Sequence, residues 1–127
     1  MRHTVVVSGP AAPAEVWERY ARYDQWPRWA PHLREVTATG DRIAPGATGV
    51  VTSVGGVRAR FVVTAVDEAG RTWSWQVTAV GVQMTLRHTV VPHGTGSRAV
   101  LDMTAPWPVP VLYAPLAGWA LHRLTGS

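Results

Sequence analysis

Cysteine and lysine are both absent from the 127-residue chain. Without cysteine, neither a disulfide framework nor a thiolate metal site is possible, and the fold does not depend on an oxidising compartment. The twelve basic residues are all arginines, a bias typical of GC-rich coding sequence, and they are spread from Arg2 to Arg123. Because phosphate binding needs clustered cations, the net charge of +4 indicates a solvated surface rather than a nucleic-acid partner.

Long apolar runs are also missing. The N-terminal segment MRHTVVVSGPAAP holds only three consecutive valines before Ser8, Gly9 and Pro10. This run is too short for the apolar region of a signal peptide or for a membrane span. We therefore expect a cytoplasmic protein that does not insert into a membrane.

The aromatic residues are strongly biased toward tryptophan, with seven Trp, three Tyr and one Phe. Tryptophan combines a large apolar ring with an N–H donor, so it suits an apolar surface that must also meet a polar group or a ligand. A chain of 127 residues is long enough for one hydrophobic core, and we expect a single domain, 1–127. The bias toward tryptophan is the first indication of a pocket in that core.

Hydrophobic periodicity predicts an α+β fold. A strand at 3–8 is followed by a helix that begins near Pro13, and then by the segment DQWPRWAPH, where Pro27 and Pro31 leave room for one short helix. Period-two alternation predicts six more strands at 33–39, 47–54, 57–66, 71–80, 82–91 and 97–105, with links short enough to make them antiparallel neighbours. The prolines after residue 105 exclude helix, and a closing helix runs from Pro115 to about Leu124. The predicted architecture is a curved seven-stranded antiparallel sheet whose apolar face is covered by helix.

The same alternation predicts which side chains share the apolar, concave face of the sheet. His88 is the one titratable residue on this face, and it is either a hydrogen-bonded core histidine or a general acid or base. Trp73 and Trp75 are either ordinary core residues or part of a pocket wall. The residues assigned to this face include Val51, Phe61, Ala65, Trp73, Trp75, Met84, Leu86, His88, Leu101 and Met103.

Motifs for other chemistries are absent from the sequence. The five histidines show no spacing typical of a metal site, and there is no phosphate-binding glycine loop and no Gly-x-Ser-x-Gly motif. We predict neither a metal nor a cofactor.

The segment from Pro13 to Gly40 resembles the N-terminal signature of the START/Bet v 1-like (SRPBCC) superfamily, and the strand order is similar over nearly the whole chain. Within the superfamily the sequence looks most like the bacterial polyketide cyclase/dehydrase and lipid-transport group. The resemblance implies a helix-grip fold, in which the sheet encloses an apolar cavity against the C-terminal helix. In relatives this helix is usually longer than the one predicted here. The shorter helix would leave the cavity with a wider mouth, or a partner subunit of a homodimer would complete it. The residues that carry the resemblance are Pro13, Val16, Trp17, Asp24, Trp26, Pro27, Trp29 and Pro31.

Three functions follow as hypotheses. The leading one is a cyclase or dehydratase for a bulky hydrophobic intermediate, of the kind found in antibiotic biosynthesis, with His88 as general acid or base and Tyr113 as hydrogen-bond donor. The second is a carrier that binds a hydrophobic molecule or lipid without chemistry, and the third is a protein-interaction module marked by exposed Trp107 or Trp119. Trp26 and Trp29 either pack a short helix or contact the ligand. The predicted substrate-binding residues are Trp26, Trp29, Phe61, Trp73, Trp75, Met84, Leu86, Leu101, Met103 and Trp119.

Overall fold

The computed structural model describes residues 1–126. Its strands are β1 (Arg2–Gly9), β2 (Leu33–Ala38), β3 (Thr48–Ser53), β4 (Arg58–Asp67), β5 (Thr72–Ala79), β6 (Val82–His93) and β7 (Gly96–Thr104). Its helices are α1 (Pro13–Ala21), a 3-10 turn η1 (Tyr23–Gln25), α2 (Trp26–Trp29) and α3 (Val109–Thr125).

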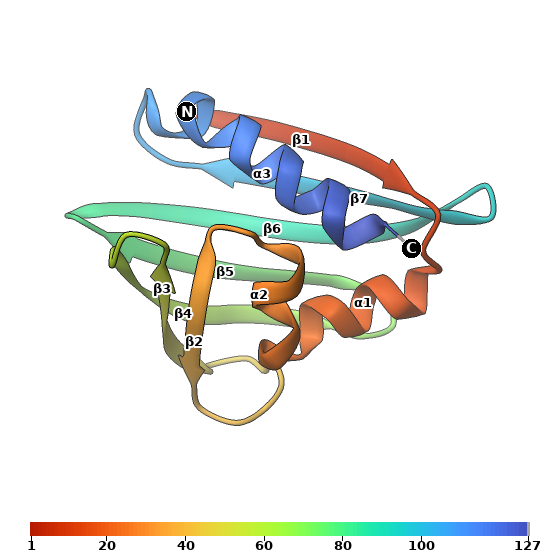
Figure 1. The fold of residues 1–127 in the computed structure, drawn as a ribbon, viewed down its shortest axis with the longest axis horizontal. Coiled ribbons are helices and arrows are strands. Elements are labelled where there is room, and N and C mark those ends of the chain that lie inside the picture. The colour runs from red at the N-terminus through yellow and green to blue at the C-terminus, as the bar shows by residue number, and fades with distance from the viewer. Residues whose placement is uncertain (127) are drawn as a thin grey trace.

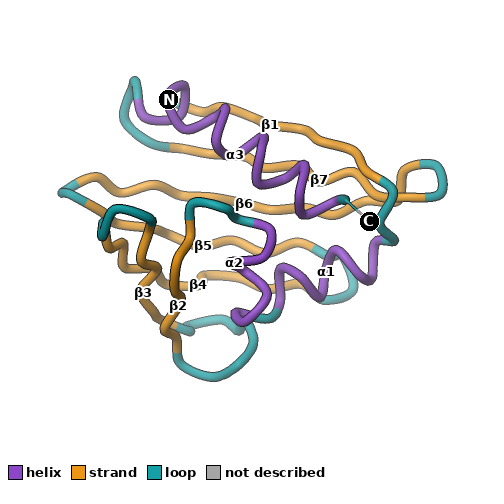
Figure 2. Tube along the Cα trace, viewed as in Figure 1, coloured by secondary structure: helices purple, strands orange, loops and turns teal. Residues whose placement is uncertain are grey.

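All seven strands form one antiparallel sheet in the order β1-β7-β6-β5-β4-β3-β2. Strands β2 to β7 form a meander, and β1 completes the sheet by pairing with β7 along its whole length. The sheet curves around the helices: α3 packs against β1 and β7, while α1 and α2 cover the other half of the concave face (Figure 1). The secondary-structure view shows the same two layers (Figure 2). The predicted seven-stranded sheet with covering helices is confirmed.

The short helix α2 is joined to α1 by its two tryptophans. The last carbonyl groups of a helix have no partner within the helix. Here the indole Nε1 of Trp26 donates to the carbonyl of Tyr20 at 2.8 Å, and Nε1 of Trp29 donates to the carbonyl of Arg19 at 2.9 Å. The two indoles therefore satisfy the C-terminal end of α1 and fix α2 over the concave face.

The predicted start of the last helix is wrong. Helix α3 begins at Val109, six residues before Pro115, and spans 17 residues, so the expected short C-terminal helix is not observed. Pro110 lies in the first turn, where backbone N–H groups make no hydrogen bond within the helix, so a proline costs none. Pro115 lies inside the helix and removes one hydrogen bond, to the carbonyl of Val111, whose exposed position leaves that carbonyl accessible to water.

One predicted facing in β4 is also wrong. The register shifts between Val63, which pairs with Trp75, and Ala65, which pairs with Ser74, and this irregularity is a β-bulge. Because the extra residue reverses the alternation, Ala65 is exposed and Val66 packs against the core instead. Alternation alone does not reveal where a strand is interrupted in this way.

Candidate functional site

The concave face and the helices enclose an apolar cavity of about 250 Å³. Its walls come from α2, from strands β2 to β7 and from α3, so residues far apart in sequence meet around one space. Ala117 and Ala120 are the side chains that the middle of α3 presents to it. Because their methyl groups are small, they leave space that larger residues on this helix would fill.

Most of the predicted pocket residues border this cavity. Trp26 and Trp29 come from α2, while Trp73 and Trp75 come from β5. The tryptophans pack closely, with ring centroids 5.1 Å apart for Trp73 and Trp75 and for Trp26 and Trp75. They give the cavity a largely aromatic wall. The predicted residues that border the cavity are Trp26, Trp29, Trp73, Trp75, Met84, Leu86, His88, Leu101 and Tyr113.

Three predicted ligand contacts lie elsewhere. Phe61 is buried behind the wall, with its ring centroid 5.4 Å from that of Trp75, and Met103 is fully buried in the core. Trp119 is 55% exposed, because the residues of α3 that turn inward are Ala117, Ala120 and Leu121 instead. The structure does not place Trp119 at the cavity, because the face of α3 that points inward carries smaller residues.

His88 is buried, and both of its ring nitrogens are engaged. The indole Nε1–H of Trp75 donates to His88 Nε2 at 3.0 Å. An indole nitrogen can only donate, so Nε2 carries the lone pair and the neutral ring has its proton on Nδ1. That proton faces the hydroxyl oxygen of Tyr20, 3.0 Å from Nδ1. The ring of His88 also stacks on that of Trp73, with centroids 4.6 Å apart and planes inclined by 12°.

This environment keeps His88 neutral. Burial lowers its pKa to about 3, and burial raises the pKa of Tyr20 well above its usual range. The Nε2 lone pair, which a general base would use, already accepts the indole proton. The geometry thus favours the interpretation of His88 as a hydrogen-bonded core histidine over that of an acid or base.

His32 and Tyr113 form a second pair of polar side chains at the cavity. The Tyr113 hydroxyl lies 3.4 Å from His32 Nε2, and the two rings meet edge to face at 6.0 Å. His32 Nδ1 is buried and has no partner within residues 1–126. Burial lowers the pKa of His32 and raises the pKa of Tyr113 to about 12, so both are uncharged at neutral pH. This pair retains unused hydrogen-bonding capacity at the cavity.

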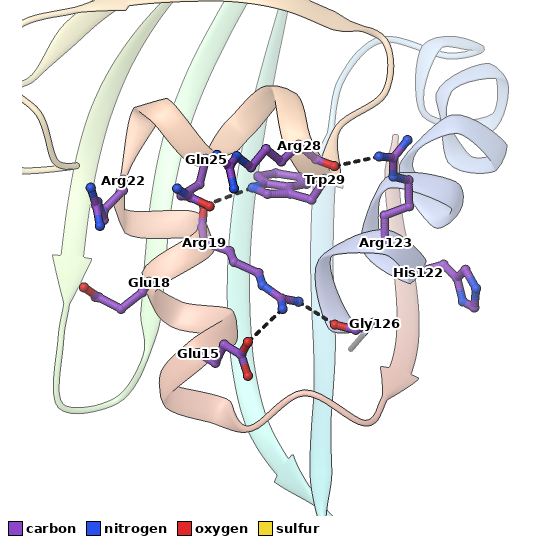
Figure 3. Close-up of a pocket in the computed structure, with 10 residues that line it drawn as sticks. All are labelled: Glu15, Glu18, Arg19, Arg22, Gln25, Arg28, Trp29, His122, Arg123 and Gly126. Carbon is purple, nitrogen blue, oxygen red and sulfur yellow. Dashed lines mark hydrogen bonds and ion pairs between the residues drawn. The ribbon is translucent and has the colours of Figure 1, made fainter.

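A larger and more polar cleft, of about 800 Å³, lies on the surface between α1, α2 and the end of α3 (Figure 3). Arg19 crosses it to donate to the carbonyls of Leu124 and Gly126 at 2.6 Å each, and also pairs with Glu15. Arg123 donates to the carbonyl of Arg28 at 2.8 Å. These side chains hold the three helices together. Trp29 borders both this cleft and the apolar cavity.

Neither membrane-spanning nor metal-binding features were found in the part of the chain that the structure describes. In residues 1–126 none of the helices has the length and apolarity needed to cross a membrane. No group of three or more His, Asp or Glu side chains in the same range is arranged to hold a metal ion.

Sequence reasoning missed His32, Ser53 and the two alanines Ala117 and Ala120 as cavity residues. The metal-ligand spacing of the histidines does not single out His32, but its place between the tryptophan-rich segment and the next strand is a usable signal. The alanines carry no chemical signal, and their role depends on the register of α3.

Comparisons with known proteins agree with this fold. Residues 1–126 match the family described as polyketide cyclase/dehydrase and lipid transport. Among curated proteins, none matches the sequence significantly.

Several solved structures are similar in fold. The major latex-like protein 151 from Panax ginseng has a TM-score of 0.81 at 10% identity, covering 98% of this chain and 95% of that one. Protein Ms6760 from Mycobacterium smegmatis has a TM-score of 0.73 at 21% identity, covering 98% and 88%. DynU16, a protein of the dynemicin biosynthetic locus, has a TM-score of 0.74 at 22% identity, covering 98% and 45%. The chain therefore belongs to the polyketide cyclase/dehydrase and lipid-transport family, within the START/Bet v 1-like (SRPBCC) superfamily.

Proposed function

We propose that the protein binds a compact, polyketide-like hydrophobic molecule in its cavity, with a polar oxygen directed to His32 and Tyr113. The observation that carries this proposal is the aromatic cavity of about 250 Å³ between the sheet and α3. Ligand sites are usually concave and mostly apolar, with a few polar groups that fix orientation. A cavity of this size favours one or two fused rings over a long lipid chain.

The polar pair supplies the orienting groups. His32 Nδ1 is buried without a partner, and leaving such an atom unsatisfied costs roughly 1–3 kcal/mol. A ligand that approaches His32 and Tyr113 can recover part of this cost by hydrogen bonding. The faces of the tryptophan rings supply area on which a planar ligand ring can stack.

A substitution that fills the cavity tests this proposal. Ala117→Leu adds three carbons to a side chain that borders the cavity, whereas Ala114→Leu adds the same volume to the same helix outside its lining. Calorimetric titration with 1-naphthol, a bicyclic aromatic with one hydroxyl, measures the affinity of each variant. We expect Ala117→Leu to weaken binding at least tenfold, about 1.4 kcal/mol, and Ala114→Leu to leave it unchanged.

Equal affinities for the two variants would show that the probe binds elsewhere, and absence of binding to the wild type would remove the proposal. Thermal unfolding of both variants serves as the folding control. Native mass spectrometry of protein from its own host then identifies the molecule that occupies the cavity.

A second candidate function is catalysis of cyclisation or dehydration, and the observation that favours it is the same pair of uncharged, titratable side chains. In a dehydration, neutral His32 would take the proton from the carbon next to a ketone, while Tyr113 donates a hydrogen bond to the carbonyl oxygen. The C–O bond of a β-hydroxyl group then breaks as protonated His32 returns its proton to the departing oxygen, so that water leaves and His32 is neutral again. The high pKa of Tyr113, about 12, keeps its hydroxyl protonated for this role. His88 is not needed for this step.

A β-hydroxy ketone of the tetralone type tests this candidate, because loss of water followed by tautomerisation gives a naphthol with new ultraviolet absorbance. Dehydration above the buffer rate that is lost in both His32→Gln and Tyr113→Phe supports catalysis. A rate equal to that of buffer, with the probe still bound, favours the carrier function.

A further inference from the structure

Exposed apolar side chains gather at one end of the sheet. Strands β1, β2, β4 and β6 begin at this end, and β3, β5 and β7 finish there. The N-terminus, the β3–β4 and β5–β6 hairpins and the start of α3 therefore lie together, at the left in Figure 1. Val80 is 89% exposed and Leu112 is 74% exposed. This set, here called the apolar end, comprises Met1, Val54, Val57, Val80, Trp107, Val111 and Leu112.

The apolar cavity reaches the same end. His32 precedes β2, Ser53 ends β3, Val57 precedes β4 and Ala79 ends β5, and all four border the cavity. Tyr113, in the second turn of α3, completes this part of the lining. A ligand that enters or leaves between the hairpins and α3 would pass the exposed apolar side chains.

Charge is distributed unevenly between the two ends. Four exposed arginines lie at this end: Arg2 in β1, Arg34 in β2, and Arg58 and Arg60 in β4. Two carboxylates of the described chain lie among them, Glu35 in β2 and Asp102 in β7, and Asp102 pairs with Arg2 at 3.5 Å. The other six carboxylates lie in α1, η1 and the loops and strand ends at the opposite end: Glu15, Glu18, Asp24, Asp41, Asp67 and Glu68. The apolar end thus carries more arginines than carboxylates, whereas carboxylates gather at the opposite end.

We propose that the apolar end docks on an anionic lipid surface. Apolar side chains on separate hairpin tips can enter the headgroup region, and each arginine near an anionic bilayer contributes to attraction. The β3–β4 tip contains Gly55 and Gly56, whose φ angles of 97° and 85° are accessible to glycine, so the flanking valines extend on a tight turn. The contact is interfacial and involves no membrane-spanning segment. It goes beyond ligand binding because it assigns a surface and a partner.

Vesicle flotation tests the proposal, using vesicles of equal phosphatidylcholine and phosphatidylglycerol and vesicles of phosphatidylcholine alone. We expect the wild type to bind the anionic vesicles, less so at high salt, and to bind the neutral ones weakly. Val80→Asp should weaken binding about tenfold by removing apolar contact and adding negative charge. Its φ of 50° is a conformation that aspartate tolerates. Arg58→Gln should weaken binding about fivefold.

Val6→Asp is the matched control, because Val6 is also exposed, at 53%, but lies in the middle of β1. Equal loss in Val80→Asp and Val6→Asp, or no binding of the wild type to anionic vesicles at low salt, would overturn the proposal. A concentration-dependent dimer that Val80→Asp disrupts, without vesicle binding, would assign the apolar end to a second copy instead and also overturn it. Titration with 1-naphthol shows separately whether the cavity still binds, so the two proposals can fail independently.

Discussion

Two histidines border the same cavity, and they differ in what their ring nitrogens contact. His88 has Trp75 on one nitrogen and Tyr20 on the other, and it stacks on Trp73. His32 has one long contact, 3.4 Å to the Tyr113 hydroxyl, and its Nδ1 has no partner among residues 1–126. Both are neutral at pH 7 because burial lowers both pKa values. The difference between them is therefore in hydrogen bonding and not in charge.

This difference separates stability from function. A buried polar group with all its hydrogen bonds made contributes to the free energy of folding and has nothing left to offer a ligand. A buried polar group without partners lowers stability, and such groups are found where a ligand or substrate supplies the missing partner. We infer that His88 serves the fold and that His32 serves the site.

The largest expected effect is on His88. Replacement by leucine leaves the Trp75 indole N–H and the Tyr20 hydroxyl without partners in the core, each at a cost of roughly 1–3 kcal/mol. We expect His88→Leu to lower the free energy of unfolding by about 4 kcal/mol in urea denaturation. His88→Gln keeps an acceptor and a donor and should lose less. Unchanged stability of His88→Leu would remove the contrast between the histidines.

The pH dependence of stability follows from the same residue. The pKa of His88 is about 3 in the folded protein and about 6.5 in the unfolded chain. The unfolded chain therefore binds the proton first as the pH falls below 6.5, and stability declines until about pH 3. The loss from His88 is about 3 kcal/mol between pH 8 and pH 4.5. His32 acts in the same direction.

Urea denaturation at a series of pH values measures this loss. Subtracting the profile of His88→Gln isolates the contribution of His88, because carboxylates titrate equally in both proteins. Parallel profiles would mean that His88 titrates near its ordinary pKa and is accessible to protons.

The sequence predicted the fold well because its signals are local and repeated. Alternation placed seven strands, and Pro27 between two tryptophans placed the short helix α2. It failed where one residue acts against the pattern: the bulge near Ala65 reverses the facing of Val66, and the prolines before Pro115 begin α3 instead of preventing it. In both cases tertiary packing decides which of two locally acceptable conformations forms.

The candidate site was predicted in part for the same reason. Large residues on the concave face were found, because hydrophobicity and facing are readable from alternation. The choice between His88 and His32 was not readable, since it depends on whether Trp75 and Tyr20 reach the ring of His88. These contacts join β5, β6 and α1, so their presence becomes known only when the elements are packed together.

His32 provides the next test of the contrast. Because its Nδ1 already lacks a partner, His32→Leu should leave the free energy of unfolding unchanged or raise it by up to about 1 kcal/mol. Affinity for 1-naphthol should fall about tenfold, while affinity for naphthalene, which has no hydroxyl, stays the same. Calorimetric titration with the two probes measures the difference. Equal losses for both probes would indicate that His32 only shapes the cavity.

The smallest expected effect is at Tyr113. Tyr113→Phe removes one hydroxyl while keeping the ring that packs against His32, so the stability change should be below about 1 kcal/mol. The variant loses a donor toward the ligand and also leaves His32 Nε2 free to bind the naphthol hydroxyl directly. We therefore expect only a threefold to fivefold loss of 1-naphthol affinity, roughly 1 kcal/mol, smaller than for His32→Leu. If Tyr113→Phe instead costs more affinity than His32→Leu, the tyrosine is the principal ligand contact and the histidine merely positions it. The double variant distinguishes these arrangements, because its loss is less than additive when the two side chains act on the ligand as one hydrogen-bonded pair.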